Sequence, residues 1–264
     1  MTETRTRDEF QAFCEGVHTL TNIDLSQYKR AQMERRIRTF VARRGVSSLA
    51  GYIQILNGSE QEVDSFLDRV TINVSQLWRN PEQWETLASV LVPELAVTGR
   101  IRAWSAGCSY GAEVYTVAAT CLSSAPEGTR IDVLGTDIDR RMVDRARSGV
   151  FSADDARTAP SKHLERWFNA STQGWTANSE LRRAVRFDVG DLLADRIPTS
   201  TYDLVLCRNV VIYFNEDVKN ALHRRLAESI RSDGYLIVGA TERVANPADL
   251  GLVGTQPFTY RKVR

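Results

Sequence analysis

A glycine turn followed by two carboxylates is the feature of this sequence that could hold a small ligand. The run GCSYG at residues 107–111 follows a strand-like segment. Glycine there lets the backbone approach a ligand and present the amides of the next helix. Glu113 lies two residues beyond the turn, and Asp137 ends the next strand-like segment. A carboxylate at the end of that strand can accept hydrogen bonds from both hydroxyls of a ribose. The spacing therefore indicates a ribose-bearing ligand near Gly107, Glu113 and Asp137.

The same carboxylates also have structural explanations. Asp137 or Asp139 could cap the helix that follows, and we favour ribose binding for Asp137 and capping for Asp139. Glu113 stands at a helix N-terminus, where the macrodipole stabilises a negative charge. A cationic ligand nearby would give that charge a second use. The turn is not GxGxxG, and no GKS or GKT follows it, which argues against NAD and against a P-loop nucleotide.

The elements that must position these residues follow from a change of periodicity at Arg100. Strand-like and helical segments alternate from there to the C-terminus, a pattern typical of a mainly parallel, doubly wound α/β sheet. Ligands bind such sheets at the carboxyl ends of the strands. The predicted helices are residues 111–124, 140–148 and 216–231, and the predicted strands are IRAWSAG (101–107), IDVLGTD (131–137), AVRFDV (184–189), YDLVLCRN (202–209), YLIVGATE (235–242) and FTYRKV (258–263).

Two regions depart from that alternation. From Arg7 to about Leu95 the apolar residues recur at threes and fours, which predicts a helical N-terminal domain over residues 1–95 in front of a sheet domain over 96–264. Residues 151–184 are polar but carry Trp167 and Trp175, and a bare loop of that length would be unusual. We therefore expect a small inserted subdomain there, built from a helix and a short hairpin.

One predicted helix, within residues 28–44, is strongly basic. Seven positive charges face a single glutamate, while Met33, Ile37, Phe40 and Val41 form an apolar stripe. Gly45 is a plausible stop for this helix. The run of arginines could be an ordinary solvated face, but its charge would also steer an acidic partner. Nucleic acid is the rival partner, disfavoured because the stretch lacks interleaved aromatic residues and a recognisable binding motif.

The overall composition limits the class of protein. Of 264 residues, 42% are hydrophobic and 25% charged, and no run of about 18 apolar residues could span a bilayer. The first 20 residues lack the features of a secretory signal, so we expect a cytoplasmic protein without membrane insertion. As a separate expectation, we take the protein to be a monomer. A net charge of +1 argues against general attraction to nucleic acid. The four cysteines form no CxxC pair and the three histidines are far apart in sequence, so no metal site is predicted.

Four motifs in register resemble those of the chemotaxis receptor methyltransferase (CheR) family over nearly the whole chain. They are TINVSQLWR (71–79), WSAGCSYGAEVY (104–115), GTDID with ARSG (135–139 and 146–149), and CRNVVIYF (207–214). The resemblance implies a Rossmann-like class I methyltransferase sheet with an N-terminal all-helical domain and a small inserted β-subdomain. It implies S-adenosylmethionine as the methyl donor and S-adenosylhomocysteine as the product. The implied reaction is methyl esterification of glutamates on the cytoplasmic region of a chemotaxis-type receptor, for sensory adaptation.

The resemblance also implies roles for particular residues. Arg79 and Tyr213 would face the transferring methyl group. The basic helix would dock the receptor through Lys29, Arg35, Arg36 and Arg38. The cofactor contacts carried over by position are Asn73, Ser75, Arg79, Glu113, Asp137, Asp191, Leu192, Arg208 and Asn209, to which the glycine turn adds Gly107. The sequence departs from the family at Ala112 and Val114, which replace a glutamate and a proline, and at Asp191, where asparagine is common.

The proposed chemistry needs no general base. An unperturbed glutamate has a pKa of about 4.3 and is already ionised at neutral pH, so catalysis depends on alignment and on removing water from the carboxylate. Arg79 could orient the substrate carboxylate through its planar set of donors. Two alternatives remain: a methyltransferase for another substrate on the same fold, and a non-catalytic adaptor that binds S-adenosylmethionine or a receptor.

Overall fold

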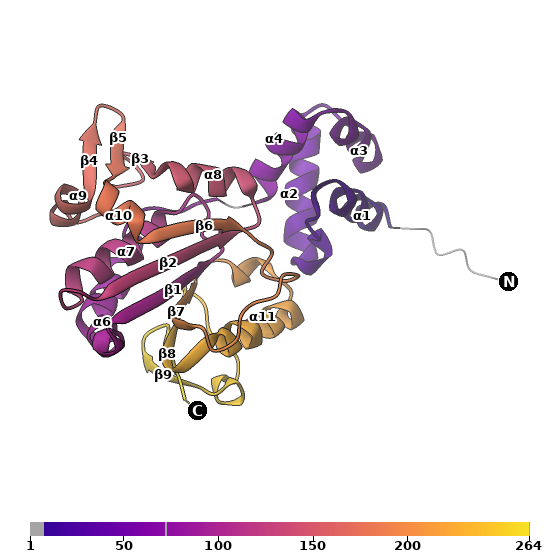
Figure 1. Ribbon diagram of the computed structural model, residues 1–264. Coiled ribbons are helices and arrows are strands. Elements are labelled where there is room, and N and C mark those ends of the chain that lie inside the picture. Colours follow the sequence, from indigo (N-terminus) through magenta and orange to yellow (C-terminus); the bar gives the residue numbers. More distant parts are fainter. Residues whose placement is uncertain (1–7, 72, 264) are drawn as a thin grey trace. The chain divides into compact units, whose positions relative to one another are not determined.

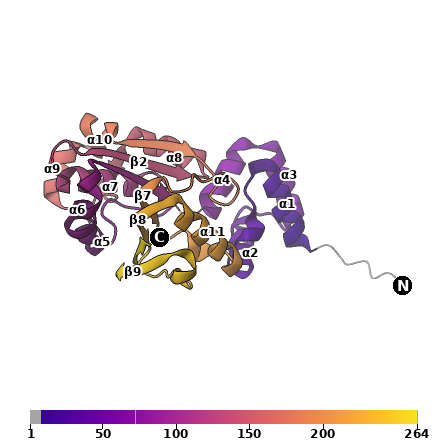
Figure 2. The same cartoon turned by 60° about the horizontal axis from the view of Figure 1, so that its bottom comes forward.

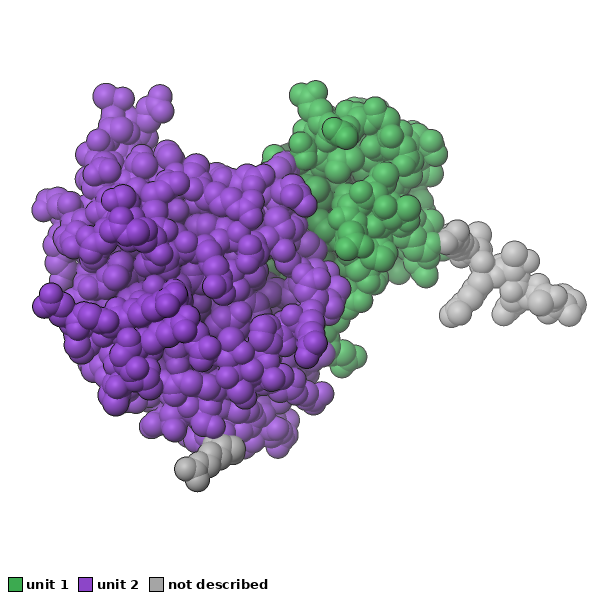
Figure 3. Space-filling model, in the orientation of Figure 1, with its two compact units in different colours: residues 1–72, 213–218 green, residues 73–212, 219–264 purple. Residues whose placement is uncertain are grey.

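The computed structural model of the protein describes residues 8–71 and 73–263. The chain forms two compact units, coloured separately in Figure 3. The first comprises residues 1–72 with 213–218, and the second comprises residues 73–212 with 219–264. The boundary expected between residues 95 and 96 lies inside the second unit. Arg7, where the helical pattern begins in the sequence, lies outside the described residues.

The first unit is helical, as expected. Aromatic rings fill its core: Phe13 meets Phe66 edge-on with the centroids 5.8 Å apart, and Tyr52 lies 5.9 Å from both Phe40 and Phe66. Polar side chains cap the N-termini of several helices. Ser48 Oγ, for example, accepts the Gly51 amide at the start of the helix over Leu49–Gly58. Its elements in the N-terminal segment are α1 (Glu9–Thr21), η1 (Leu25–Gln27), α2 (Arg30–Arg43), α3 (Leu49–Gly58) and α4 (Glu60–Val70).

The basic helix is α2. Met33, Ile37 and Val41 are buried as the apolar stripe predicted, and the half-buried Phe40 ring contacts the aromatic core. Gly45 follows the helix with a φ of +74°, in the left-handed region that glycine adopts without steric cost. The predicted helix and its stop are therefore confirmed.

Residues 73–98 belong to the second unit because their apolar side chains pack against the helix that follows the first strand of its sheet. Leu87, Leu91 and Leu95 are each at most 1% exposed, and this stretch contacts α7 (Ala112–Ser124). The stretch contains α5 (Pro81–Thr86), the π-helical turn η2 (Leu87–Leu91), α6 (Val92–Leu95) and η3 (Ala96–Thr98).

Among the described residues, seven strands of the second unit form one sheet in the order β6-β2-β1-β7-β8-β10-β9 (Figure 1, Figure 2). The pairs from β6 to β8 are parallel, and β10 runs antiparallel to both β8 and β9. The strands are β1 (Arg100–Ala106), β2 (Arg130–Asp137), β6 (Val185–Val189), β7 (Tyr202–Cys207), β8 (Ile230–Val238), β9 (Leu252–Gln256) and β10 (Thr259–Lys262). The predicted strands and the α/β class are confirmed, while β9 was not predicted.

Helices connect the parallel strands. α7 packs against β1 and β2, and α8 (Arg140–Ser148) packs against β2 and β6. α11 (Glu216–Ser229) leads into β8. The remaining short helices are η4 (Val211–Tyr213) and η5 (Pro247–Leu250). No helix in the described ranges is both long enough and apolar enough to cross a bilayer.

The expected inserted subdomain is present. Its β4–β5 hairpin gains a further antiparallel strand, β3, which pairs with β5 (Figure 1). Gly174 in β5 has a φ of +140°, and a Cβ there would lie 2.1 Å from the Phe151 carbonyl oxygen, so this close crossing requires glycine. The elements are β3 (Val150–Ser152), α9 (Ser161–Trp167), β4 (Phe168–Ser171), β5 (Gly174–Ala177) and α10 (Ser179–Arg183).

Candidate functional site

The turn after β1 requires glycine at two positions, because neighbouring side chains pack directly against its backbone there. Gly107 and Gly111 have φ values of +79° and +87°, which favour glycine. A Cβ on Gly107 would lie 2.6 Å from a Val210 methyl carbon, and a Cβ on Gly111 would lie 2.8 Å from Ala146 Cβ. The Gly107 amide donates to the Thr136 carbonyl at 2.9 Å, which joins the turn to the end of β2.

Asp137 stands at that end of β2 with its carboxylate already oriented. One oxygen accepts the Ser109 amide at 2.7 Å, and the other accepts the Asp139 amide at 3.0 Å. Burial raises the pKa of Asp137, although these backbone hydrogen bonds lower it. Each oxygen keeps a further lone pair, so the half-buried carboxylate can still accept from a ligand.

Asp139 caps the following helix, as expected. Its side chain accepts the Arg141 amide at 3.0 Å at the start of α8. The two aspartates therefore differ in position: Asp139 satisfies a helix N-terminus, whereas Asp137 bridges the backbone of two neighbouring loops.

Glu113 shares its charge with a cation from the protein itself. Its carboxylate accepts the Ser105 hydroxyl at 2.8 Å and Arg208 Nη1 at 2.9 Å. Because Arg208 neutralises Glu113, the carboxylate offers a cationic ligand less attraction than an isolated charge would.

Arg208 lies at the end of β7, and its side chain is only 2% exposed. Its Nε donates to Gln83 Oε1 at 2.7 Å, and its Nη2 donates to the Arg79 carbonyl and to Asn80 Oδ1, each at 3.0 Å. The guanidinium also stacks 4.8 Å from the centre of the Trp84 ring. Arg208 thus holds the segment around Arg79 against the sheet.

The segment 73–79 is joined to the glycine turn. Asn73 Oδ1 accepts the Ser109 hydroxyl at 3.2 Å, and its amide nitrogen donates to Asp139 at 3.3 Å. The Tyr110 hydroxyl donates to the Ser75 carbonyl. The structure therefore brings the predicted residues Asn73 and Ser75 to the carboxyl ends of β1 and β2.

Arg79 presents a cation at the end of this segment. Its Nη1 donates to the Val74 carbonyl at 2.9 Å, and the side chain is half-buried. The Arg79 carbonyl accepts Trp84 Nε1 at 2.8 Å, which fixes the backbone. Within residues 8–71 and 73–263, no acidic side chain forms an ion pair with Arg79. Most of the guanidinium donors are therefore available to an acceptor.

The loop after β6 carries the predicted residues Asp191 and Leu192. Its first amide, from Gly190, donates to the Asp137 carbonyl at 2.9 Å. The Asp191 carboxylate accepts the Leu193 amide at 2.7 Å and so shapes the turn from within. The half-buried Leu192 thus lies in a loop tied to the end of β2.

Asn209 adopts a left-handed conformation, with a φ of +60°. Its amide donates at 2.9 Å to Glu242, whose same carboxylate oxygen accepts the Gly239 amide at 2.6 Å. Glu242 is 3% exposed, its other oxygen has no hydrogen-bond partner among the described residues, and burial raises its pKa. Sequence reasoning missed Glu242, and its position just after the β8 strand was the signal that could have indicated it.

Tyr213 belongs to the first unit, whereas Arg79 belongs to the second. The Tyr213 carbonyl accepts the Lys29 amide at 2.9 Å. The neighbouring Phe214 ring lies 5.0 Å from that of Tyr28. The catalytic pairing of Arg79 with Tyr213 stays a prediction.

The predicted docking residues all lie in or beside α2. Arg38 is paired with Glu9 at 3.1 Å and with Glu34 at 2.9 Å, and Arg36 donates to a backbone carbonyl. Arg35 is exposed and has no ion pair among the described residues. The basic charge of this helix is thus partly balanced and partly presented to solvent.

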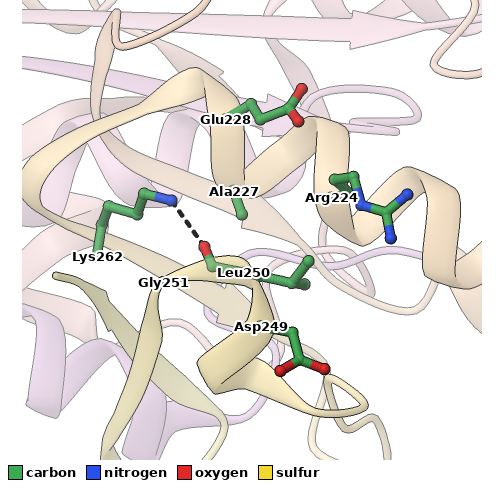
Figure 4. Close-up of a pocket in the computed structure, with 7 residues that line it drawn as sticks. All are labelled: Arg224, Ala227, Glu228, Asp249, Leu250, Gly251 and Lys262. Atoms are coloured by element: carbon green, nitrogen blue, oxygen red, sulfur yellow. Dashed lines mark hydrogen bonds between the residues drawn. The ribbon is translucent and has the colours of Figure 1, made fainter. Parts of the chain in front are cut away.

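A recess of about 340 Å³ lies elsewhere in the second unit (Figure 4). Lys262 Nζ donates there to the Leu250 carbonyl at 2.7 Å. The residues that line it are Arg224, Ala227, Glu228, Asp249, Leu250, Gly251 and Lys262. None of the predicted cofactor residues is among them, so this recess is not the candidate site.

Comparison with known proteins identifies the family of the chain. Residues 73–258 match the CheR methyltransferase SAM-binding domain, and residues 8–71 match the CheR methyltransferase all-alpha domain. The chain is therefore an S-adenosylmethionine-dependent methyltransferase. It belongs to the CheR methyltransferase family.

Two chemotaxis protein methyltransferases of similar length support this membership. The chain is 34% identical over 243 residues to a chemotaxis protein methyltransferase of Listeria innocua, covering 91% of this chain and 92% of that protein. It is 28% identical over 271 residues to one of Borreliella burgdorferi, covering 97% and 95%. A solved TehB-like SAM-dependent methyltransferase from Corynebacterium glutamicum shares 17% identity at a TM-score of 0.36, over 69% of this chain and 92% of that one.

The residues present fit S-adenosylmethionine. The positive φ angles of Gly107 and Gly111 set the shape of the turn, and the oriented Asp137 carboxylate beside it offers acceptors for ribose hydroxyls. The Asp191–Leu192 loop is attached beside that carboxylate. The expected cofactor is thus supported by both the family and the chemistry of the strand ends.

Proposed function

We propose that this methyltransferase esterifies glutamate side chains on the cytoplasmic region of chemotaxis-type receptors, for sensory adaptation. The names of its relatives, chemotaxis protein methyltransferases, support the chemotaxis assignment. The single observation that carries the acceptor class is Arg79, a half-buried cation without an acidic partner among the described residues. An anionic acceptor such as a carboxylate is the natural complement of such a group.

In this proposal the protein contributes orientation and an environment poor in water. The bound cofactor supplies a methyl group on a cationic sulfur. The Val74 carbonyl fixes one edge of the Arg79 guanidinium, and the remaining donors orient the glutamate carboxylate. A carboxylate is already ionised at neutral pH, so no side chain has to remove a proton. Arg79 acts through alignment, because too tight a grip would weaken the nucleophile.

The cofactor-binding roles follow from position. Asp137 holds the ribose hydroxyls, and the backbone turn that begins at Gly107 lies beside the cofactor. The Asp191–Leu192 loop and Asn209 complete the cofactor surface. Asn73, Ser75, Glu113 and Arg208 act largely by holding these groups in place. Tyr213 faces the methyl group in the family pattern, and we keep that role for it.

Receptor docking is assigned to α2. Its basic residues Lys29, Arg35, Arg36 and Arg38 would attract the glutamate-rich methylated region of a receptor. The ion pairs of Arg38 reduce its share of that attraction, and the exposed Arg35 contributes most.

The test is incubation of the full-length protein with methyl-labelled S-adenosylmethionine and a panel of receptor cytoplasmic fragments. We expect label on glutamates, released as methanol by mild base. Matched fragments in which those glutamates are changed to glutamine should not become labelled. Label that resists base would overturn the carboxyl assignment and favour another substrate. Cofactor binding without transfer to any fragment would favour a non-catalytic adaptor.

A further inference from the structure

The loop after β6 is held from outside by one side chain that the family pattern does not assign. Arg225 Nη1 donates to the Leu192 carbonyl at 2.6 Å and to the Leu193 carbonyl at 2.5 Å. Its Nη2 donates to the Asp195 carbonyl. Arg225 lies on α11, 30 to 33 positions further along the chain than these carbonyls, so the contacts are tertiary.

Arg225 donates to carbonyls that the hydrogen bonds within the turn do not use. Inside the loop, the Asp195 amide donates to the Asp191 carbonyl at 2.9 Å, and the Asp191 amide donates to the Asp195 carboxylate at 2.7 Å. Those bonds close the turn but do not attach it to α11. A planar guanidinium can serve several converging acceptors at once, which a single ammonium group does less well.

The loop is thus fixed at both ends. The Gly190 amide binds the backbone carbonyl of Asp137, the residue proposed to hold the ribose, and Arg225 fixes the far end against α11. Ordering a free loop on ligand binding costs conformational entropy, and a loop ordered beforehand avoids that cost.

We propose that Arg225 is a positioning residue for cofactor binding, which orders the 190–195 loop before S-adenosylmethionine arrives. This inference rests on the proposed placement of Asp191 and Leu192 at the cofactor. Arg225 acts through the loop backbone and touches neither the methyl group nor the acceptor.

The neighbouring Arg224 provides a matched control. It lies on the same helix and carries the same charge, but it lines the recess of Figure 4, and among the described residues it forms no hydrogen bond to the loop. Comparing Arg225→Met with Arg224→Met therefore separates the loop contacts from general effects of charge or helix stability.

The experiment measures S-adenosylhomocysteine affinity of the full-length protein by titration calorimetry, together with hydrogen exchange of the loop amides without ligand. We expect Arg225→Met to weaken binding about tenfold or more and to speed exchange at Leu193 and Asp195. Arg224→Met should change neither. Arg225→Lys keeps the positive charge but loses the planar set of donors. Its affinity for S-adenosylhomocysteine should lie between those of wild type and Arg225→Met.

Three results would overturn the inference: unchanged affinity in folded Arg225→Met, equal loss in Arg224→Met, or wild-type affinity in Arg225→Lys. Wild-type protein that bound no S-adenosylhomocysteine would instead overturn the proposed cofactor site itself, and this outcome is distinguishable because it requires no variant.

Discussion

The Arg208 guanidinium and the Glu113 carboxylate form an ion pair of 2.9 Å with 2% and 12% of their side chains exposed. The pair joins the end of β7 to the start of α7, and further bonds from Arg208 reach the segment that carries Arg79. A buried charge is tolerated when its partner and its remaining hydrogen bonds are all supplied. This pair is therefore expected to act as one structural group.

Removing Arg208 alone should be costly. Arg208→Met leaves Glu113 buried without its counter-charge, and breaking such a pair costs about 3–5 kcal/mol. Adding Glu113→Gln to that variant should restore part of the loss. Urea unfolding of the single and double variants measures both values, and a double variant less stable than Arg208→Met would contradict the pairing.

Changing Asp137 should affect the cofactor. In Asp137→Asn, an NH₂ group replaces one of the two oxygens that accept the Ser109 and Asp139 amides. Two donors then face each other, so one of these two hydrogen bonds is lost. S-adenosylhomocysteine affinity should fall about tenfold or more. Asp132→Asn, on the same strand at an exposed ion pair, serves as control. Equal affinity in both variants by calorimetry would remove the ribose assignment.

Changing Arg79 should affect turnover more than cofactor binding. Arg79→Ala removes the group proposed to orient the acceptor, and we expect kcat/KM for a receptor fragment to fall about a hundredfold. S-adenosylhomocysteine affinity should change little. Arg157→Ala is the control, since this exposed arginine contacts Gln76 of the same segment. Full turnover in Arg79→Ala would exclude the orienting role.

Receptor docking should depend more on Arg35 than on Arg38. Arg35→Glu reverses an exposed charge, whereas Arg38→Glu also breaks pairs with Glu9 and Glu34. We expect Arg35→Glu to raise KM for the receptor, with a difference from wild type that shrinks as salt increases. Cofactor affinity should stay constant. Steady-state kinetics at two ionic strengths tests this, and an unchanged KM would exclude α2 as the docking surface.

Glu242 should make stability depend on pH. Burial raises its pKa above the ordinary value of 4.5, so the folded state binds this proton more tightly than the unfolded state does. Stability from this group therefore falls as pH rises from 4.5 through the folded-state pKa. Glu242→Gln keeps an acceptor for the Gly239 and Asn209 amides and removes the charge.

Urea unfolding between pH 4.5 and pH 8 measures this difference. We expect the stability of Glu242→Gln relative to wild type to increase with pH. Glu242→Leu should instead lose about 1–3 kcal/mol for each amide left without an acceptor. Parallel pH profiles for wild type and Glu242→Gln would show that the buried carboxyl does not titrate as described.

The fold was predictable because its signals are local. Apolar spacing placed α2 and its stop at Gly45, and the glycine turn and Asp137 marked the ends of β1 and β2. The strand β9 was missed because Leu252 is buried while the rest of that edge strand is exposed, so it lacks a clear alternation.

The supporting side chains of the site were not predictable, because their partners lie far away in sequence. Arg208 binds Gln83 and Glu113 across 125 and 95 positions, and nothing local to Arg208 reveals that it is buried. Arg225 likewise reads as an ordinary helix arginine until the loop carbonyls lie beside it. Family resemblance gave the position of Arg208 but not its hydrogen-bond partners.

Residues 213–218 make the helical unit discontinuous in the gene. Lys29 and Gln27 bond to Tyr213 and Asn215, and the buried Phe214 packs on Tyr28. If residues 1–72 were exchanged between two relatives, one partner of each of these contacts would come from one protein and the other partner from the second. The two segments must be inherited together or change in step, even though 140 residues of another unit separate them in the chain.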